Sequence, residues 1–404
     1  MQKTPISSRL HVGIFGKTNS GKSSLFNAIF GQDIAIVSRH KGTTTDPIIK
    51  AMELNPFGPI ALIDTAGLGD DTIIGSSRIR KTIGILSRID LAIYAADISD
   101  FDKGAYLRML KEFKKYKIDH ILVFTKSDLC PREERQGIQD LYEDAIFTSV
   151  KQPASIEGLK EEIGKKLENL EIKDLPIIGD LLDQSSTVIM VVPLDEAAPK
   201  GRLILPQVQF IRECLDYEIN CLVVRETQLE GAIKDLNKID LVVTDSQIFG
   251  EVDRILPREI PLTSFSMLLA RQKGDLDKLI EGASYLETLP QGAKVLMAEG
   301  CSHSHTHEDI GRVKIPNLIK EYTGKNLEFD FYSGHDFPSN LKDYDLIVHC
   351  GGCMLNKKAI LTRLSICEEV GVPVTNYGVI LAYLNGILPR CSQIFKQDRG
   401  LAYD

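Results

Sequence analysis

The chain has 404 residues, of which 43% are hydrophobic and 26% are charged, and its formal net charge is −8. These values exclude a collagen-like, low-complexity or mainly disordered chain, and the acidic balance argues against a general nucleic-acid binder. No apolar run reaches the ~20 residues that a membrane helix needs, and the N-terminus has no hydrophobic signal core. We therefore expect a cytoplasmic protein of two or three domains, with neither membrane nor nucleic acid as a partner.

The first third of the chain alternates strand-sized apolar runs with helical stretches. Strands are expected at 10–15, 60–64, 91–95 and 120–125, and a helix at 156–170 is expected to close this unit. Such alternation predicts a parallel sheet with helices on both faces.

Two further α/β blocks follow a linker at 171–185, and Pro257–Pro261 marks the boundary between them. The middle block alternates strands and helices between 187 and 256. The third block is predicted to contain two helices, a strand, a helix, two strands and a helix, at 263–271, 275–289, 293–297, 310–322, 327–331, 344–349 and 357–370. The predicted domains are therefore 1–172, 173–260 and 261–404.

A Gly-rich segment between the first predicted strand and helix fits the phosphate-binding pattern G-x-x-x-x-G-K-S/T. Inward-turned backbone N–H groups and the helix N-terminus favour phosphate oxygens. Lys22 is expected to reach the β- and γ-phosphates and Ser23 to bind Mg²⁺, with Asp64 holding the same ion through water and Gly67 meeting the γ-phosphate. The predicted nucleotide-binding residues of this loop are Gly16, Asn19, Ser20, Gly21, Lys22, Ser23 and Ser24.

A second motif selects the base. Thr125-Lys126-Ser127-Asp128 follows a predicted strand and resembles the N/T-K-x-D motif of GTPases. In that motif the carboxylate accepts hydrogen bonds from guanine N1–H and N2–H₂, and adenine offers no such pair. Ser149-Val150-Lys151 is a weaker candidate for the last loop on the guanine side, with Ser149 and Val150 as its predicted nucleotide-binding residues. The predicted ligands are therefore GTP and GDP with Mg²⁺.

The segment Gly42-Thr43-Thr44-Thr45-Asp46 stands where a switch loop is expected. It resembles the G-T-T-R-D of the translation-factor-related GTPases, which include tRNA-modification GTPases and the ribosome-assembly GTPase Era. By that alignment Thr44 binds Mg²⁺, whereas the family's Arg is replaced here by Thr45. Leu68 occupies the place of the water-orienting Gln of Ras-like proteins, so intrinsic hydrolysis should be slow or use other groups. Asn19 matches the Asn that helps to hold K⁺ in potassium-activated members, and a turn-capping role is the alternative.

Five of the eight cysteines and five of the eight histidines lie in the last 104 residues. Cys301 and His303 follow one predicted strand, and His349-Cys350-Gly351-Gly352-Cys353 ends another, so both segments lie where open α/β sheets place ligands. Three thiolates suit an iron–sulfur cluster or zinc. A redox dithiol, a structural zinc site and a solvated histidine loop are the alternatives.

A potassium-type GTPase joined to this C-x-H and H-C-x-x-C motif resembles the FeFe-hydrogenase maturation GTPases over the whole chain. The resemblance implies an α/β chain, with an N-terminal P-loop GTPase domain, a dimerisation domain and a smaller α/β domain that carries a metal-cluster site. It implies a 4Fe–4S cluster and its surroundings at Cys301, Cys350, Cys353, His303 and His349. Three thiolates leave the fourth iron of such a cluster open, and Glu308 and Asp309 are close enough in sequence to cap that iron.

The resemblance also implies a GTP-hydrolysing scaffold. Such a protein is a homodimer or larger homo-oligomer. It receives a transient two-iron precursor, built with two radical-SAM maturases, and delivers this precursor to apo FeFe-hydrogenase. GTP and K⁺ would then act on switch loops and domain contacts. An Era-like RNA-linked GTPase with structural zinc and a regulatory GTPase with a redox-sensing cluster are the competing hypotheses.

Overall fold

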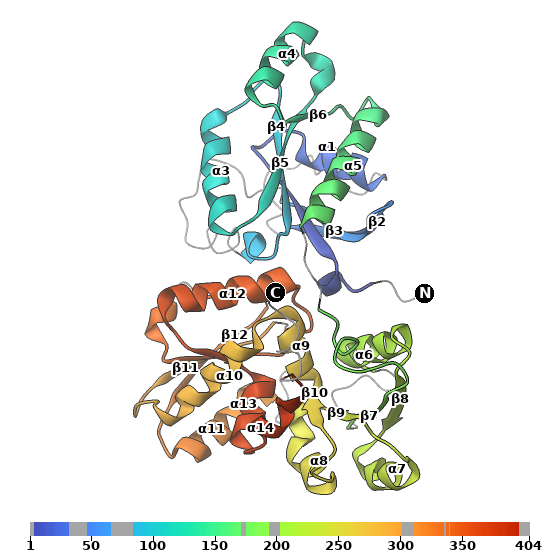
Figure 1. The fold of residues 1–404 in the computed structure, drawn as a ribbon. Helices are drawn as coiled ribbons and strands as arrows, with labels where there is room; N and C mark the ends of the chain where they lie inside the picture. Colours follow the sequence, from blue (N-terminus) through green and yellow to red (C-terminus); the bar gives the residue numbers. More distant parts are fainter. Residues whose placement is uncertain are drawn as a thin grey trace, which may run out of the picture. The chain divides into compact units, whose positions relative to one another are not determined.

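The computed structural model describes residues 4–31, 47–65, 84–170, 175–193, 203–300, 310–334, 337–338 and 340–395. The chain divides into two compact units, Met1–Lys173 and Asp174–Asp404. The first contains one sheet and the second contains two (Figure 1). The α/β fold predicted from the sequence is confirmed.

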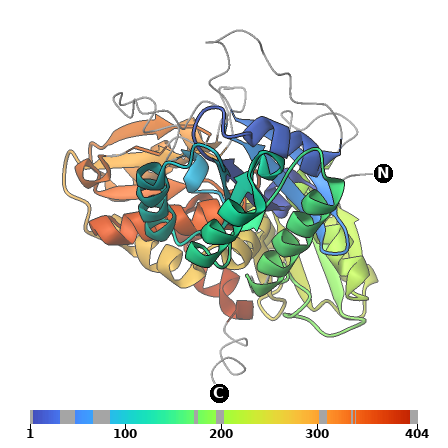
Figure 2. The same cartoon turned by 90° about the horizontal axis from the view of Figure 1, so that it is seen from above.

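The first unit is a six-stranded sheet in the order β2-β3-β1-β4-β5-β6, in which only the β2–β3 pair is antiparallel. Its strands are β1 (Leu10–Phe15), β2 (Ile48–Leu54), β3 (Gly58–Asp64), β4 (Leu91–Asp97), β5 (Asp119–Thr125) and β6 (Ile146–Phe147). Its helices are α1 (Lys22–Phe30), α3 (Lys103–Lys115), α4 (Arg132–Leu141) and α5 (Pro153–Asn169). Helices α1 and α5 cover one face and α3 the other (Figures 1 and 2).

The central strands of this sheet are apolar on both faces because helices cover both. Along β4, Ile93 packs in the core layer with α1 and α5, whereas its neighbour Tyr94 packs in the layer with α3. A strand buried on both faces has a nearly continuous apolar sequence. Strand β2 escaped prediction because it is a half-exposed edge strand, in which Lys50 and Glu53 interrupt the apolar residues.

The second unit contains two parallel four-stranded sheets, in the orders β10-β9-β7-β8 and β12-β11-β13-β14. The strands are β7 (Thr187–Val191), β8 (Asn220–Val224), β9 (Leu241–Thr244), β10 (Leu262–Ser264), β11 (Lys294–Ala298), β12 (Glu328–Tyr332), β13 (Leu346–His349) and β14 (Val374–Asn376). The helices are α6 (Leu205–Asp216), α7 (Leu229–Asp235), α8 (Phe249–Ile255), α9 (Phe265–Lys273), α10 (Leu276–Ser284), α11 (Ile315–Thr323), α12 (Lys357–Val370), α13 (Tyr377–Leu384) and α14 (Leu388–Cys391).

One hydrophobic core spans both sheets of the second unit. It contains residues of β7 and β9 from the first sheet and of β11 and β13 from the second, together with residues of α9, α10 and α12. The predicted helix at 263–271 is wrong at its start. Residues Leu262–Ser264 form edge strand β10, and the Ser264 hydroxyl then accepts a hydrogen bond from Met267 N to cap α9. Helix α9 therefore leads directly from the first sheet of this unit to the second.

The segment after Pro373 contains more structure than the sequence predicted. It forms β14 and α13, and α13 is buried over most of its length. A helix that is apolar on all sides shows no helical periodicity, which is why the pattern did not reveal it. Among the described helices, none is long and apolar enough to cross a membrane.

Candidate functional site

The P-loop lies between β1 and α1, as predicted. Gly16 has φ +141°, and a Cβ at this position would come within 2.1 Å of the Ala95 carbonyl oxygen, so only glycine fits. Asn19 also adopts a positive φ, 64°. The Lys22 ammonium is buried and donates to the carbonyl oxygens of Gly16 and Lys17 at 2.7 and 2.6 Å. The lysine is thus held inside the loop at the start of the helix, where a phosphate group would bind.

Two of the predicted magnesium residues come together, Ser23 from helix α1 and Asp64 from strand β3. Ser23 Oγ donates to Asp64 Oδ2 at 2.8 Å, and Asp64 is 1% exposed at the end of β3. A hydroxyl and a carboxylate at this separation can approach one cation, directly or through water. The residues of the site therefore fit Mg²⁺.

Two residues of the T-K-x-D motif form hydrogen bonds with the backbone of the P-loop. Thr125 Oγ1 donates to the carbonyl oxygen of Ser20 at 2.7 Å, which ties the end of β5 to the phosphate loop. Lys126 Nζ donates to the Asn19 carbonyl oxygen at 3.1 Å and to the Asp97 carboxylate at 2.6 Å. These contacts place the lysine alongside the loop, where its stem can cover a flat base.

Two neighbouring side chains orient the Asp128 carboxylate, which is a hydrogen-bond acceptor. It accepts from Ser149 Oγ at 2.7 Å and from Lys151 Nζ at 2.9 Å. The Lys151 and Ser149 hydrogen bonds lower the pKa of Asp128, so the carboxylate stays ionised. Ser149 and Val150, predicted as a guanine-side loop, thus lie next to the predicted base-reading carboxylate. Lys151 belongs to the same predicted loop, whereas Asp97, the partner of Lys126, was missed because nothing in its spacing marks it.

Four predicted site residues lie outside the described residues: Thr44, Gly67, Cys301 and His303. The same holds for Glu308 and Asp309. Their roles stay predictions. Among the residues that the structure describes, no group of three or more potential metal ligands comes together.

The H-C-x-x-C segment follows β13, at the carboxyl edge of the second sheet, where β11 also ends at Ala298. Cys350 Sγ accepts from the N–H groups of Gly300 at 2.9 Å and Gly352 at 3.4 Å. Burial raises the pKa of the Cys350 thiol, and these two N–H groups oppose the rise because they stabilise a thiolate. Backbone N–H groups directed at sulfur are the environment that a metal-bound thiolate requires. Cys350 and its surroundings therefore fit a cluster or zinc.

His349 is buried at 6% exposure and both of its ring nitrogens have partners. Nδ1–H donates to the Cys350 carbonyl oxygen at 2.7 Å, and Nε2 accepts from Arg363 Nη1 at 2.7 Å. Burial, with the nearby Arg363 charge, lowers the pKa of His349 to about 3, so the ring is neutral. In this arrangement His349 orients the loop, and Arg363 of α12 is a contributor that the sequence did not reveal.

Lys273 is a second buried cation at this loop that the sequence analysis missed. Its Nζ lies 3.4 Å from the carbonyl oxygens of Gly352 and Cys353 and 3.0 Å from that of Leu355. A lone lysine at the end of a helix gives no signal in sequence, since most such lysines are exposed.

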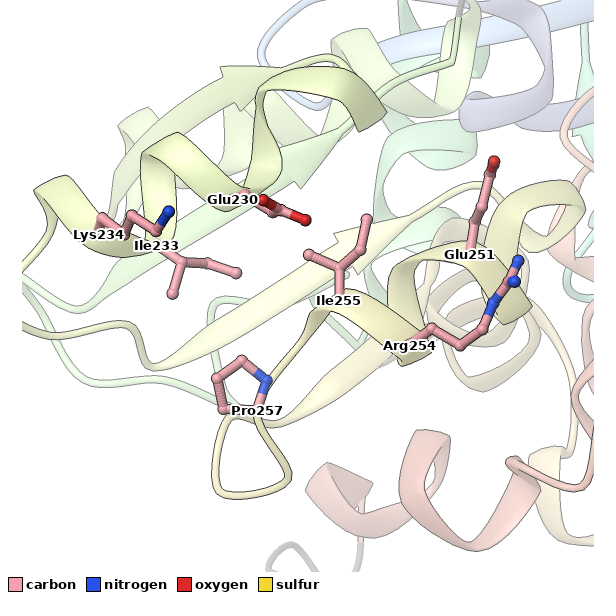
Figure 3. Close-up of a pocket in the computed structure, with 7 residues that line it drawn as sticks. All are labelled: Glu230, Ile233, Lys234, Glu251, Arg254, Ile255 and Pro257. Carbon is pink, nitrogen blue, oxygen red and sulfur yellow. The ribbon is translucent and has the colours of Figure 1, made fainter.

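A separate open groove of about 550 Å³ lies between α7 and α8 (Figure 3). Ile233 of α7 and Ile255 of α8 face the space between the two helices, and Glu230, Lys234, Glu251 and Arg254 surround it. Its lining includes none of the residues predicted for nucleotide or cluster binding.

Three domain families match the chain in succession. The description "50S ribosome-binding GTPase" matches residues 11–126, "Hydrogen maturase F dimerization domain" matches 177–274, and "Hydrogen maturase F tetramerization domain" matches 277–394. The boundary predicted at 260 stays a prediction. The two named oligomerisation domains support a homo-oligomer.

Similar proteins are GTPases. The tRNA modification GTPase MnmE of Aquifex aeolicus is 30% identical over 60% of this chain and 50% of its own length, and that of Mesoplasma florum is 31% identical over 43% and 37%. GTPase Der of Kosmotoga olearia is 28% identical over 41% and 40%. The chain thus spans at most half the length of these relatives. The crystal structure of the G domain of the T. maritima FeoB iron transporter is 28% identical over 40% of this chain and 98% of its own, with a TM-score of 0.30.

The P-loop, the Ser23–Asp64 pair and the Asp128 site define a P-loop GTPase with two additional α/β modules. Both modules match domains described as those of hydrogen maturase F. The chain belongs to the hydrogen maturase F family, the hydrogenase maturation GTPases.

Proposed function

We propose that this protein is a GTP-dependent scaffold that binds a 4Fe–4S cluster and carries a two-iron precursor to apo FeFe-hydrogenase. The observation that carries the cluster assignment is the pair of N–H groups, from Gly300 and Gly352, directed at Cys350 Sγ beside Cys353. The ligands proposed are Cys301, Cys350 and Cys353. Three thiolates leave one iron open, and that iron can accept a bridging ligand from a second iron unit.

The nucleotide side of the proposal uses the first unit. Lys22 and the P-loop amides bind the phosphates, Ser23 and Asp64 hold Mg²⁺, and Asp128 reads guanine. Thr44 and Gly67 complete the site as switch residues. K⁺ binds next to Asn19 and offsets negative charge on the phosphates during hydrolysis.

The partners proposed are those that the cargo requires: two radical-SAM maturases that build the precursor and the apo-hydrogenase that receives it. The dimerisation and tetramerisation modules, 177–274 and 277–394, support assembly of the scaffold as a homo-oligomer. GTP binding acts on switch loops and domain contacts and forms no covalent bond with the metal centre.

The cluster is tested by anaerobic reconstitution with iron and sulfide, followed by metal analysis and EPR of the reduced protein. We expect about four irons per chain in the wild type. Cys350→Ala should lose the cluster, whereas the control Cys367→Ala, at a buried cysteine within α12, should keep it. Zinc bound without a cluster signal would overturn the proposal and favour a GTPase with a structural metal site.

The potassium site has its own test. GTP hydrolysis should be faster in KCl than in NaCl at equal ionic strength, and Asn19→Ala should remove the difference. Equal rates of the wild type in the two salts would refute the K⁺ assignment without affecting the cluster.

A further inference from the structure

The cluster loop is held by a residue that reaches it from outside its own module. Lys273 is the last residue of α9 and is 6% exposed. It lies within 177–274, the range matched by the dimerisation domain, whereas Cys350 and Cys353 lie within 277–394. Helix α9 follows β10 of the first sheet of this unit and ends against the loop that follows β13 of the second. The environment of the thiols thus includes a part of the neighbouring module.

Three contacts of Lys273 are with the backbone of the loop. Its ammonium group has three hydrogens, and three carbonyl oxygens, of residues 352, 353 and 355, lie 3.0–3.4 Å from Nζ. Turning these carbonyls toward one point requires a tight loop, and Gly352 supplies it with φ +64°. A Cβ at Gly352 would lie 2.7 Å from Ile360 Cδ1, so the loop is also closely packed against α12.

The charge of Lys273 also lies close to one of the proposed cluster ligands, Cys353. The Lys273 Nζ lies 3.4 Å from the carbonyl oxygen of Cys353 and is buried, so the positive charge is held at the backbone of that ligand. A positive charge that stabilises a thiolate also stabilises a cluster bound by thiolates, and it does so more strongly after reduction adds an electron. Net charge and hydrogen bonding around a cluster are among the factors that set its reduction potential.

We propose that Lys273 is a positioning residue of the cluster site, which fixes the Cys350–Cys353 loop by its carbonyl contacts and raises the reduction potential of the cluster bound there. This inference rests on the proposed function, because it requires a cluster at these cysteines. It makes the dimerisation module part of the electrostatic environment of the metal centre.

The test compares Lys273→Gln, Lys273→Met and Lys273→Arg with the wild type in full-length protein. Gln keeps a hydrogen-bond donor without charge, Met removes both, and Arg restores both. Lys294→Met is the matched control, since it removes one lysine charge from the exposed start of β11, at the opposite edge of the same sheet. The readouts are iron content, the EPR spectrum and the midpoint potential in an EPR-monitored redox titration, with GTP hydrolysis as a check that the chain is folded.

We expect the Gln variant to bind a cluster whose midpoint potential is lower by about 59 mV, a tenfold change in the one-electron equilibrium. The Met variant should in addition bind less iron, and the Arg variant should restore wild-type potential and iron content. A wild-type potential and EPR spectrum in folded Lys273→Gln would overturn the inference while the proposed function stands. If Lys273→Met fails to fold, the Gln and Arg variants decide alone. Absence of a cluster in wild-type protein would instead overturn the proposed function.

Discussion

The nucleotide site and the proposed cluster site of this protein are built in different ways. The phosphate side of the nucleotide site comes from one continuous segment, in which Lys22 bonds to carbonyls only five and six residues away. The proposed cluster site joins the ends of two strands, Ala298 and His349, with buried cations from α9 and α12. A site built from local backbone is visible as a motif, whereas a site built across elements is visible only in part.

The difference also concerns electrostatics. At the nucleotide site the ligand brings negative charge, and the loop supplies N–H groups and one lysine to receive it. At the proposed cluster site the protein itself would supply negative thiolates, and Lys273 and Arg363 are buried against the same loop, at the Cys353 carbonyl oxygen and at His349. We therefore expect that a substitution at one site impairs ligand binding or catalysis at that site and leaves the other site unchanged.

The largest expected effect separates the two sites directly. Lys22→Ala should lower GTP hydrolysis about 100- to 1,000-fold, because a charge that stabilises the transferring phosphate is lost. Iron content after reconstitution should not change. The measurement is phosphate release and metal analysis on the same preparation, and loss of the cluster from a well-folded variant would contradict independent sites.

Substitution of a proposed cluster ligand is expected to affect the cluster and not GTP hydrolysis. Cys350→Ala should abolish the cluster signal, because it removes the sulfur that accepts from Gly300 and Gly352. Basal GTP hydrolysis should stay at the wild-type level. A large fall in hydrolysis rate in this variant would show that the cluster loop influences the nucleotide site.

A smaller effect is expected at Asp128, the carboxylate proposed to read guanine. Asp128→Asn replaces one acceptor oxygen by a donor, so GTP affinity should fall about 10- to 100-fold relative to that of xanthosine triphosphate. Competition of unlabelled nucleotides against a fluorescent GTP analogue measures this ratio. Unchanged preference for GTP would show that another group reads the base.

The smallest expected effect depends on pH. The Lys151 and Ser149 hydrogen bonds lower the pKa of Asp128. Its carboxylate is therefore ionised and able to bind guanine down to a lower pH than an ordinary aspartate, and binding is lost as the pH falls through that pKa. Lys151→Ala should raise the pKa and move the acid limb of GTP binding to higher pH. Titration of nucleotide affinity between neutral and acidic pH measures the shift, and an unmoved limb would exclude Lys151 as its cause.

The sequence alone was sufficient for the α/β class, the P-loop, the T-K-x-D motif and the family resemblance. These depend on local chemistry: a glycine turn at Gly16, a strand that is apolar on both faces, and fixed spacing between motif residues. Edge strand β2, strand β10 and buried helix α13 were missed because their apolar residues do not follow a clear period.

The tertiary structure decided which residues far apart in sequence surround the predicted sites. It placed Lys151 on Asp128, Arg363 on His349 and Lys273 on the Cys350–Cys353 loop. Lys151 lies in the predicted guanine-side loop, but its contact with Asp128 was not predicted, and neither Arg363 nor Lys273 belongs to a motif. Each of the three acts only because strands and helices bring it to a carboxylate, an imidazole or a loop backbone. Local motifs determine what a site can bind, whereas packing across elements determines the charges around it, because electrostatic contacts depend on distance in space and not on distance along the chain.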